Sequence, residues 1–512
     1  MEQREISIKL LADEHWWGGR VSDGLHMPYA AEHGFQASLG GDLLANQACP
    51  LLLSNQGRYV WSEEPFDFSI QDRVLHVKND SGAEIYCSDR HADLRGAYLA
   101  ASKNHFPSSG EMPERLLFTA PQYNLWIELL YSPTQEKVLQ YARDVLEHGM
   151  PAGVIMIDDN WHEPYGTWEF HSGRFPDPRG MVDELHRMGF KVMLWVCPFV
   201  SPDSLTFRQL EPTGLLLKDH SGQTAIRKWW NGYSAVLDCT HPGAVDWIHR
   251  KLRELQVRYG IDGFKFDAGD PNFYEESDRS AVPNHPNGHC EAWAKVGLPY
   301  ALNEFRACWK LAGTPLVQRL KDKKHSWEGD GLGALIPDAL AQGLLGYSFV
   351  CPDMIGGGEY IQFTSVANNL DAELFVRYAQ CSALFPMMQF SAAPWRVLDR
   401  EHLGYCVEAA NLHAKLGPEI VEIAEHSART GEPMVRHLAY EFSGQGYESI
   451  SDQFLLGSRL MAAPILNKGQ RSRIVFIPPG EWSGDDGAII AGPAIIEIEV
   501  PLSRLPWYRR VD

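Results

Sequence analysis

The stretch RYGIDGFKFDAGD, residues 258–270, indicates the fold of this chain. It closes an amphipathic helical pattern over 243–259, turns at Gly260, and continues as a short apolar run that ends on Asp267. Runs of this kind form strands that are buried on both faces of a parallel sheet. Barrels of eight parallel strands carry catalytic side chains at the carboxyl ends of the strands. The stretch therefore predicts a barrel strand with Asp267 at its functional end, although an aspartate that only caps the next loop has the same pattern.

The same alternation of short strands and helices extends over residues 121–430. Strands are predicted at 125–131, 153–159, 190–198, 261–266, 314–320, 325–331 and 346–353, and a last one ends the segment 372–390. Helical patterns separate them, including one over 290–312. Strands that alternate with helices form parallel sheets, and eight such units are typical of a (β/α)8 TIM barrel.

Both flanks of this region have the pattern of antiparallel β structure. Alternating runs such as YVWSEEPFDFSI (59–70) and RSRIVFIPPGEW (471–482) are bounded by turn residues. We therefore predict an α/β protein in three domains: an N-terminal antiparallel β-sandwich (1–120), the catalytic barrel (121–430) and a small C-terminal β-sandwich (431–512).

Composition narrows the range of partners. The chain of 512 residues has a formal net charge of −20, which disfavours nucleic acid and anionic membranes because both bind basic surfaces. No apolar run approaches the roughly 20 residues that span a bilayer. The nine cysteines form no CxxC pair and the N-terminus has no signal-peptide pattern, so we expect a cytoplasmic protein. The 16 tryptophans suit a cleft for sugar rings, although most tryptophans fill protein cores.

Polar and aromatic residues stand at or near the ends of the predicted barrel strands, and a barrel should bring them together at one mouth. They are Asp158, Asp159, Trp195, Lys265, Asp267, Arg319, Asp330 and Asp353. Several carboxylates in an aromatic cleft are the layout of a glycosidase, in which one carboxylate attacks the sugar and another protonates the leaving oxygen. The nucleophile must stay ionised, and Lys265 lies on the same strand face as Asp267. The acid needs an apolar setting, which Trp327 could supply to Asp330, although WEGDG (327–331) also fits a simple turn.

Other chemistry has weaker support in the sequence. Phosphate-binding loops of the GxxxxGK[ST] and GxGxxG kinds are missing, and we expect no metal and no organic cofactor. Adjacent residues of a strand point to opposite faces, so either Trp16 or Trp17 is exposed near a domain junction or each fills one of two packing layers. The first alternative makes Trp17 a candidate sugar contact.

Seven segments, in order along the chain, resemble glycoside hydrolase family 31, a family of retaining α-glycosidases. They are IMIDDNW (155–161), GFKVMLWVCPFV (189–200), VLDCTHPGAVDWI (236–248), DGFKFDAGD (262–270), SWEGD (326–330), CPDMIGGG (351–358) and DQFLLGSRLMAAPIL (452–466). The resemblance covers nearly the whole chain and implies that Asp267 is the nucleophile and Asp330 the general acid/base. It also implies a set of residues around the first sugar: Asp158 or Asp159, Trp195, Trp230, Arg319 and Asp353.

Two departures from the family pattern bear on the sugar. Lys265 stands where most of the family has Trp, and Gln389-Phe390-Ser391 replaces the usual Arg-Asn-His. This variant resembles the branch of the myogenesis-regulating glycosidase, which is similar to α-galactosidases. There, paired aspartates and a lysine bind the axial 4-hydroxyl and its neighbours, and an equatorial epimer leaves such a site with unpaired charge.

We therefore predict a retaining, exo-acting α-galactosidase that acts on a glycoside or oligosaccharide. Glycosidases for an α-glucoside, an α-xyloside, an α-N-acetylgalactosaminide or a sulfonated sugar are alternatives, and so is a sugar-binding protein without catalysis. The N-terminal part is shorter than is usual in the family. An outer subsite is therefore expected to be absent or to come from a second subunit of a homo-oligomer.

Overall fold

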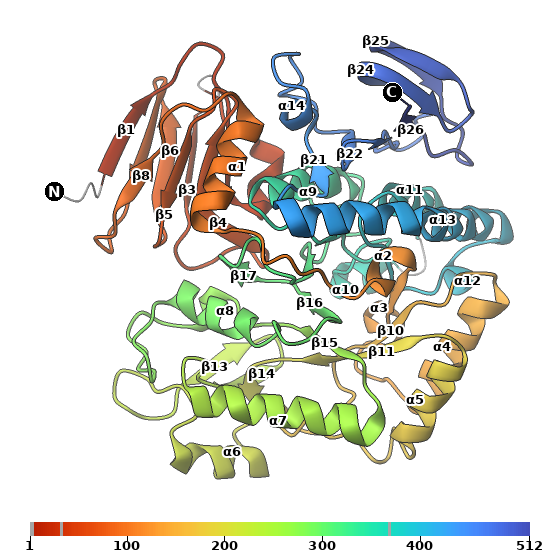
Figure 1. The fold of residues 1–512 in the computed structure, drawn as a ribbon. Coiled ribbons are helices and arrows are strands. Elements are labelled where there is room, and N and C mark those ends of the chain that lie inside the picture. Colours follow the sequence, from red (N-terminus) through yellow and green to blue (C-terminus); the bar gives the residue numbers. More distant parts are fainter. Residues whose placement is uncertain (1–4, 31–33, 367–369, 512) are drawn as a thin grey trace.

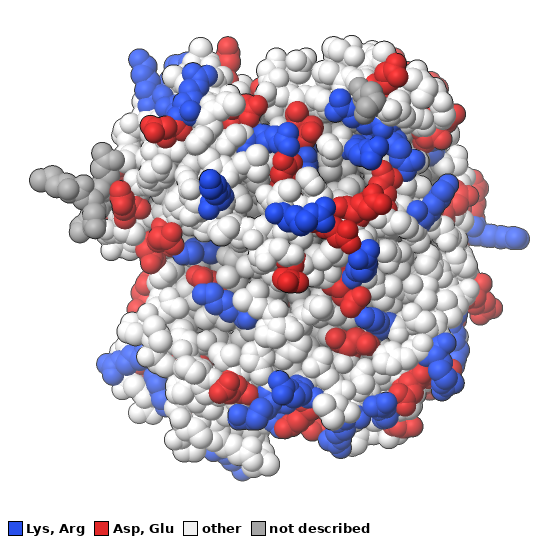
Figure 2. All heavy atoms as spheres, in the orientation of Figure 1, with Lys and Arg blue, Asp and Glu red and all other residues white. Residues whose placement is uncertain are grey.

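The structure, a computed structural model, describes residues 5–30, 34–366 and 370–511. In Figure 1 the N-terminal sheets stand beside the barrel, and the C-terminal sheet lies beyond the long helix α13 (Arg400–Thr430). Figure 2 shows acidic and basic side chains interspersed over the same face. Within the described ranges, no helix combines the length and the apolar character needed to cross a bilayer.

Eight strands, each parallel to its neighbours, form the central sheet and confirm the predicted barrel architecture. In the order of pairing they are β20 (Gln389–Phe390), β9 (Gln122–Asn124), β10 (Val154–Ile157), β11 (Lys191–Val196), β15 (Gly263–Phe266), β16 (Asn303–Phe305), β18 (Gln318–Arg319) and β19 (Val350–Cys351). The backbone N–H of Ile355, just after β19, donates to Gln389 O at 2.9 Å. This bond brings the two ends of the sheet together.

Helices cover the outside of this sheet. The main ones are α4 (Gln135–Glu147), α5 (Pro178–Arg187), α7 (Pro242–Tyr259), α8 (Pro286–Lys295), α9 (Leu335–Leu344) and α11 (Ala372–Ala383). The stretch 258–270 folds as predicted: α7 ends at Gly260, where φ is +82°, and all four residues of β15 are buried. A Cβ on Gly263 would lie 2.0 Å from the carbonyl oxygen of Leu302, so only glycine permits this approach of β15 to the next segment.

Three predicted elements differ from the structure. The first strand is β9, not 125–131, because the Asn124 side chain accepts from Trp126 N at 3.1 Å and the short helix α3 (Trp126–Leu129) follows. The predicted helix over 290–312 ends with α8 at Lys295, and the fifth strand is β16. The predicted strand 325–331 is a loop.

The N-terminal region contains two antiparallel sheets and also binds the barrel. One sheet is β1 (Glu5–Lys9), β7 (Val74–Lys78), β6 (Asp67–Gln71) and β3 (Phe35–Ser38). The other is β4 (Gln47–Ser54), β5 (Tyr59–Ser62) and β8 (Ile85–Cys87), with β2 (Trp16–Arg20) paired to β4. Strand β17 (Cys308–Trp309) leaves the barrel and adds to this second sheet, parallel to β4. The Gln47 side chain also donates to the carbonyl oxygens of Arg306 and Arg319.

Both tryptophans of β2 are buried, with 0% of Trp16 and 2% of Trp17 exposed. Trp16 lies under the Arg58 guanidinium, and Trp17 packs edge-on against His437 at 5.9 Å between ring centres. Of the two alternatives, the pair therefore fills two packing layers, and the expectation of an exposed tryptophan is wrong.

The C-terminal region is one six-stranded antiparallel sheet. Its strands pair in the order β21 (Val435–Arg436), β22 (Phe454–Leu456), β23 (Leu460–Ala462), β26 (Trp507–Arg510), β24 (Ser472–Gly484) and β25 (Ile489–Glu499). Alternate residues of β24, among them Val475 and Ile477, pack into a small separate core with Trp482. A small C-terminal β domain is therefore present, as predicted.

Candidate active site

A cavity of about 360 Å³ opens where the loops after the barrel strands meet. It is lined by Trp126, Tyr131, Asp158, Asp159, Trp195, Trp230, Lys265, Asp267, Arg306, Asp322, Glu359, Tyr360 and Ile361. Six of these residues were predicted from the sequence: Asp158, Asp159, Trp195, Trp230, Lys265 and Asp267. The structure thus brings the carboxylates, the lysine and the aromatic walls together at the expected end of the barrel.

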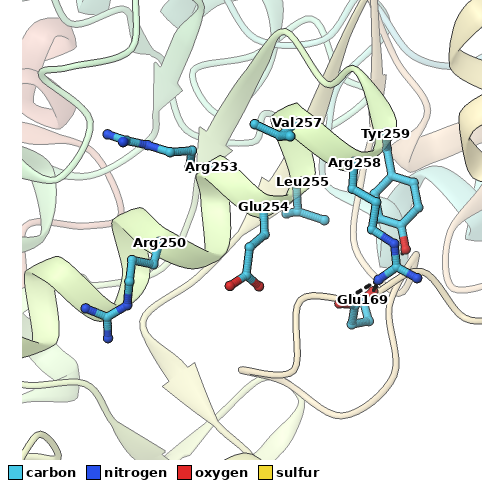
Figure 3. Close-up of a pocket in the computed structure, with 8 residues that line it drawn as sticks. All are labelled: Glu169, Arg250, Arg253, Glu254, Leu255, Val257, Arg258 and Tyr259. Carbon is cyan, nitrogen blue, oxygen red and sulfur yellow. Dashed lines mark hydrogen bonds and ion pairs between the residues drawn. The ribbon is translucent and has the colours of Figure 1, made fainter.

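Another hollow lies on the outer surface of α7 (Figure 3) and has a volume of about 480 Å³. Within it, Arg258 pairs with Glu169 at 3.0 Å, and the Tyr259 hydroxyl donates to the same carboxylate at 3.0 Å. Because the residues at the carboxyl ends of the barrel strands line the other cavity, we take that cavity as the candidate active site.

Asp267 lines the cavity and has two cations beside its carboxylate. Its Oδ2 accepts from Trp195 Nε1 at 2.8 Å, and its Oδ1 accepts from Arg306 Nε at 3.0 Å. The Lys265 ammonium is 4.0 Å from Oδ2. Burial alone would raise the pKa of Asp267, but Arg306 and Lys265 outweigh it and hold that pKa well below its usual range. The carboxylate is therefore ionised and able to act as a nucleophile.

A pair of aspartates after β10 forms the adjoining wall. Lys265 Nζ lies 2.7 Å from Asp158 Oδ2, so one ammonium connects this pair to Asp267. Asp159 accepts from Asn231 Nδ2 at 2.7 Å, and burial together with the charge of Asp158 raises its pKa to about 7. This wall offers several oxygens, and one ammonium, to the hydroxyl groups of a sugar.

Arg306 is a cavity residue that sequence reasoning missed. Its guanidinium divides between Asp267 and Asp270, whose Oδ2 it reaches at 2.8 Å, and it lies 5.2 Å from the ring centre of Trp230. Trp230 is 46% exposed and forms part of the rim. Because 290–312 had a helical pattern, the strand that delivers Arg306 to the cavity could not be seen in the sequence.

Asp322 is the other missed polar residue of consequence. It lines the cavity, its side chain is 35% exposed, and its Oδ1 accepts from Arg319 Nη1 at 2.9 Å. Asp330, by contrast, does not belong to the described cavity lining. Its side chain is 49% exposed, pairs with Lys324 at 2.6 Å and accepts from Ser326 Oγ at 3.0 Å. The hydrogen bond from Lys324 contributes most to lowering its pKa, opposite to what a general acid needs.

Four further predicted residues also lie outside the described cavity lining. Arg319 is buried beneath it, between Asp353 at 2.8 Å and Glu304 at 3.2 Å. Trp327 donates its indole N–H to Asp371 at 3.0 Å, and Trp17 packs on His437 as described above. Arg319 and Asp353 therefore lie behind the residues that line the cavity. Trp327 and Trp17 make their contacts elsewhere.

An aromatic wall completes the cavity and was also missed. Trp126 packs edge-on against Tyr131 and Tyr360, in each case with 5.2 Å between ring centres. Trp126 and Tyr131 fell in a predicted strand, and nothing in the pattern marked them as a wall. Among the residues that the structure describes, no group of three or more His, Cys, Asp or Glu is arranged to hold a metal ion.

Comparison with known proteins agrees with the barrel fold. The family model described as "Glycosyl hydrolases family 31 TIM-barrel domain" matches residues 111–421, and that of the family 31 C-terminal domain matches residues 431–512. The myogenesis-regulating glycosidase of Mus musculus is 32% identical over 420 residues, which is 80% of this chain and 58% of that protein. The α-xylosidase XylQ of Lactiplantibacillus pentosus is 25% identical over 402 residues, 72% of this chain and 50% of that protein. The chain thus spans only about half to three-fifths of the length of these relatives.

Solved structures show the same fold. The dextranase of Flavobacterium johnsoniae, solved with glucose, superposes with a TM-score of 0.87 over 99% of this chain and 66% of its own, at 19% identity. The cycloalternan-degrading enzyme of Trueperella pyogenes, solved in complex with isomaltose, superposes with a TM-score of 0.83 over 99% of this chain and 80% of its own. With the family models matched over the barrel and the C-terminal domain, this chain belongs to glycoside hydrolase family 31.

Proposed function

We propose that this protein is a retaining, exo-acting α-glycosidase, with α-galactosides as its preferred substrates. The observation that carries the proposal is the ionised Asp267 between two cations in a cavity of about 360 Å³. In a retaining reaction this carboxylate attacks the anomeric carbon while a second carboxyl group protonates the departing oxygen. Water, deprotonated by the same second group, then releases the sugar from Asp267.

We propose Asp322 as that second group, in place of Asp330. The resemblance to the family placed the role on Asp330, but Asp322 faces the cavity and Asp330 pairs with Lys324 outside it. A retaining mechanism requires about 5–5.5 Å between the two carboxyl groups when the sugar is bound. The loop that bears Asp322 follows β18, so the donor would approach from the far side of the cavity relative to Asp159.

The preference for galactose rests on the wall built by Asp158, Asp159 and Lys265. Paired carboxylates accept hydrogen bonds from two neighbouring hydroxyls, and a site matched to an axial hydroxyl discriminates against the equatorial epimer. Gln389, which the family resemblance aligns with the Arg of Arg-Asn-His, donates to Glu304 at 2.7 Å inside the barrel. No histidine is among the described residues that line the cavity.

A sulfonated sugar is the less favoured alternative, because an anionic substituent needs an unpaired cation. Lys265 is already bound by Asp158 at 2.7 Å, and Arg306 by Asp267 and Asp270. Glucosides, xylosides and N-acetylgalactosaminides remain competitors to be separated by assay. We also propose a reducing compartment such as the cytoplasm, which the nine free thiols support.

The test is the initial rate of hydrolysis of matched aryl α-glycosides: galactoside, glucoside, xyloside and N-acetylgalactosaminide. We expect the galactoside to be fastest and Asp267→Asn to abolish turnover. Asp322→Asn should lower kcat about 10²–10⁴-fold, the usual contribution of a general acid, whereas Asp330→Asn should not. Binding of galactose without turnover by the unmodified protein would instead identify a sugar-binding protein, and a faster glucoside would overturn the galactose assignment.

A further inference from the structure

Asp353, just after β19, is fully buried and joins two loops beneath the cavity. Its Oδ1 accepts from Arg319 Nη1 at 2.8 Å. Its Oδ2 accepts from the backbone N–H of Lys323 at 2.6 Å and from that of Gly358 at 2.8 Å. One carboxylate therefore holds the loop after β18 and the loop after β19 at the same time.

The same two loops meet at further points around this carboxylate. The backbone N–H of Glu359 donates to Lys323 O at 3.0 Å. The His325 ring contacts Gly356 O at 2.7 Å, and its backbone N–H donates to Gln362 Oε1 at 2.9 Å. These bonds tie residues 323–325 to residues 356–362, so the loops can be expected to move as one unit.

Two glycines let the loops approach this closely. A Cβ on Gly357, where φ is +100°, would lie 2.7 Å from Lys323 O. A Cβ on Gly358 would lie 2.7 Å from Asp353 Oδ1. Real Cβ atoms do not tolerate such contacts, so any larger residue must separate the loops or displace the carboxylate.

Asp322 lies inside this joined unit. It sits between Arg319 and Lys323, two of the three residues that Asp353 binds. Arg319 Nη1 donates both to Asp322 at 2.9 Å and to Asp353 at 2.8 Å. On the other loop, Glu359, Tyr360 and Ile361 line the cavity directly after Gly358. Asp353 thus reaches the cavity only through its neighbours.

We propose that Asp353 is a positioning residue: it fixes the loop that carries Asp322, so that this carboxyl group faces the leaving oxygen of the bound sugar. The proposal rests on the proposed function, in which Asp322 is the proton donor. It differs from the sugar contact that the family resemblance implies for Asp353, because a side chain with 0% exposure beneath the cavity cannot receive a hydroxyl group without rearrangement.

Asp353→Asn is the informative variant because the side chain keeps its shape. An amide presents one oxygen and one NH2 group, whereas all three partners of Asp353 are donors. In either orientation the NH2 group faces a donor, so at least one of the hydrogen bonds that join the two loops is lost. Gly358→Ala perturbs the same contact between the two loops, retains every charge, and serves as a second variant.

The assay compares two α-glycosides of the same sugar, the one that the unmodified enzyme hydrolyses fastest. One carries a 2,4-dinitrophenyl leaving group, which departs with little protonation, and the other a methyl group, which needs a proton. Asp353→Asn and Gly358→Ala should lower kcat at least about 10-fold more on the methyl glycoside than on the dinitrophenyl glycoside, in the same direction as Asp322→Asn. Glu14→Gln is the control, because it weakens a buried ion pair with Arg58 in the N-terminal region. It should lower stability but lower kcat equally on the two glycosides.

Hydrogen exchange supplies a readout that does not need turnover. The amides of Lys323 and Gly358 should be protected in the unmodified protein and exchange faster, together, in Asp353→Asn and Gly358→Ala but not in Glu14→Gln. Unchanged protection, or an equal loss on both leaving groups in folded Asp353→Asn, would overturn the positioning role. Full activity of Asp267→Asn and Asp322→Asn would instead reject the proposed function, and the exchange result would still decide whether Asp353 joins the loops.

Discussion

Replacing Arg306 with glutamine tests how this site keeps Asp267, the proposed nucleophile, ionised. An opposite charge within about 4–6 Å lowers a carboxyl pKa by about 1–3 units, and each unit corresponds to about 1.4 kcal/mol. Arg306 Nε is 3.0 Å from Asp267, whereas the Lys265 ammonium is 4.0 Å away and stays in the variant. We therefore expect the pKa of Asp267 to rise by about 1–3 units, which costs the ionised form about 1.4–4 kcal/mol.

The sign of the effect on rate follows from the proposed role of Asp267. The carboxylate must be ionised to attack, so the acidic limb of kcat/KM against pH follows the pKa of this group in the free enzyme. In the unmodified protein Arg306 and Lys265 keep that pKa well below its usual range, despite burial. The acidic limb of Arg306→Gln should consequently move toward neutral pH, and the loss of rate should grow as the pH falls.

The measurement is kcat/KM on an aryl α-galactoside from about pH 3 to pH 9, with folding checked by thermal unfolding at each pH. Asp270→Asn is the matched control, because it removes the other partner of Arg306 and leaves the cation beside Asp267. Its acidic limb should not move toward neutral pH. A folded Arg306→Gln enzyme with an unchanged acidic limb would refute the electrostatic argument.

Three further predictions concern stability and packing. Lys265→Met leaves the buried Asp158 carboxylate without its 2.7 Å partner and should lower the free energy of unfolding, measured by chemical denaturation, by about 3–5 kcal/mol. An unchanged free energy of unfolding would show that the pair is solvated instead. Gly269→Ala places a Cβ 2.3 Å from Trp293 Cδ1 at a φ of +75° and should cost at least about 1–3 kcal/mol, so an unchanged Tm would contradict the packing. Burial lowers the pKa of His437 to about 4 from 6.5, so the unfolded chain binds the proton first and stability falls as the pH drops through this window. His437→Asn keeps an acceptor for the backbone N–H of Ala439, which now donates to His437 Nδ1. The variant should flatten the dependence of Tm on pH, and an unaltered slope would contradict this prediction.

The parts of the site that the sequence could predict lie on long, strongly patterned segments. Strands β10, β11 and β15 each follow a clear helical pattern, and they bear Asp158, Trp195 and Asp267 at or near their carboxyl ends. In a parallel barrel these ends must meet, so the distance of residues along the sequence does not matter. Recognising these strands in the sequence was therefore enough to predict that their terminal residues line the cavity.

The parts that could not be predicted depend on short elements and on loops. Strand β16 has three residues and β18 has two, too few for a period to be recognised. Arg306 and Asp322 follow these strands, so their place in the cavity depends on elements that leave almost no pattern. The motif SWEGD resembles the family, but Lys324 and Ser326 hold Asp330 outside the cavity, and only the folded loop shows this.

The strand exchange between β17 and the N-terminal sheet has a consequence for protein engineering. Gln47 of β4 binds the carbonyl oxygens of both Arg306 and Arg319, and β17 follows Arg306 after a single intervening residue, Ala307. The N-terminal sheets are thus part of the scaffold that sets the charge around Asp267, rather than a detachable module. Swapping them for those of another family member, or trimming them to obtain a minimal catalyst, would shift both arginines. Libraries that aim to retune the proposed activity should include β4 alongside the loops of the barrel.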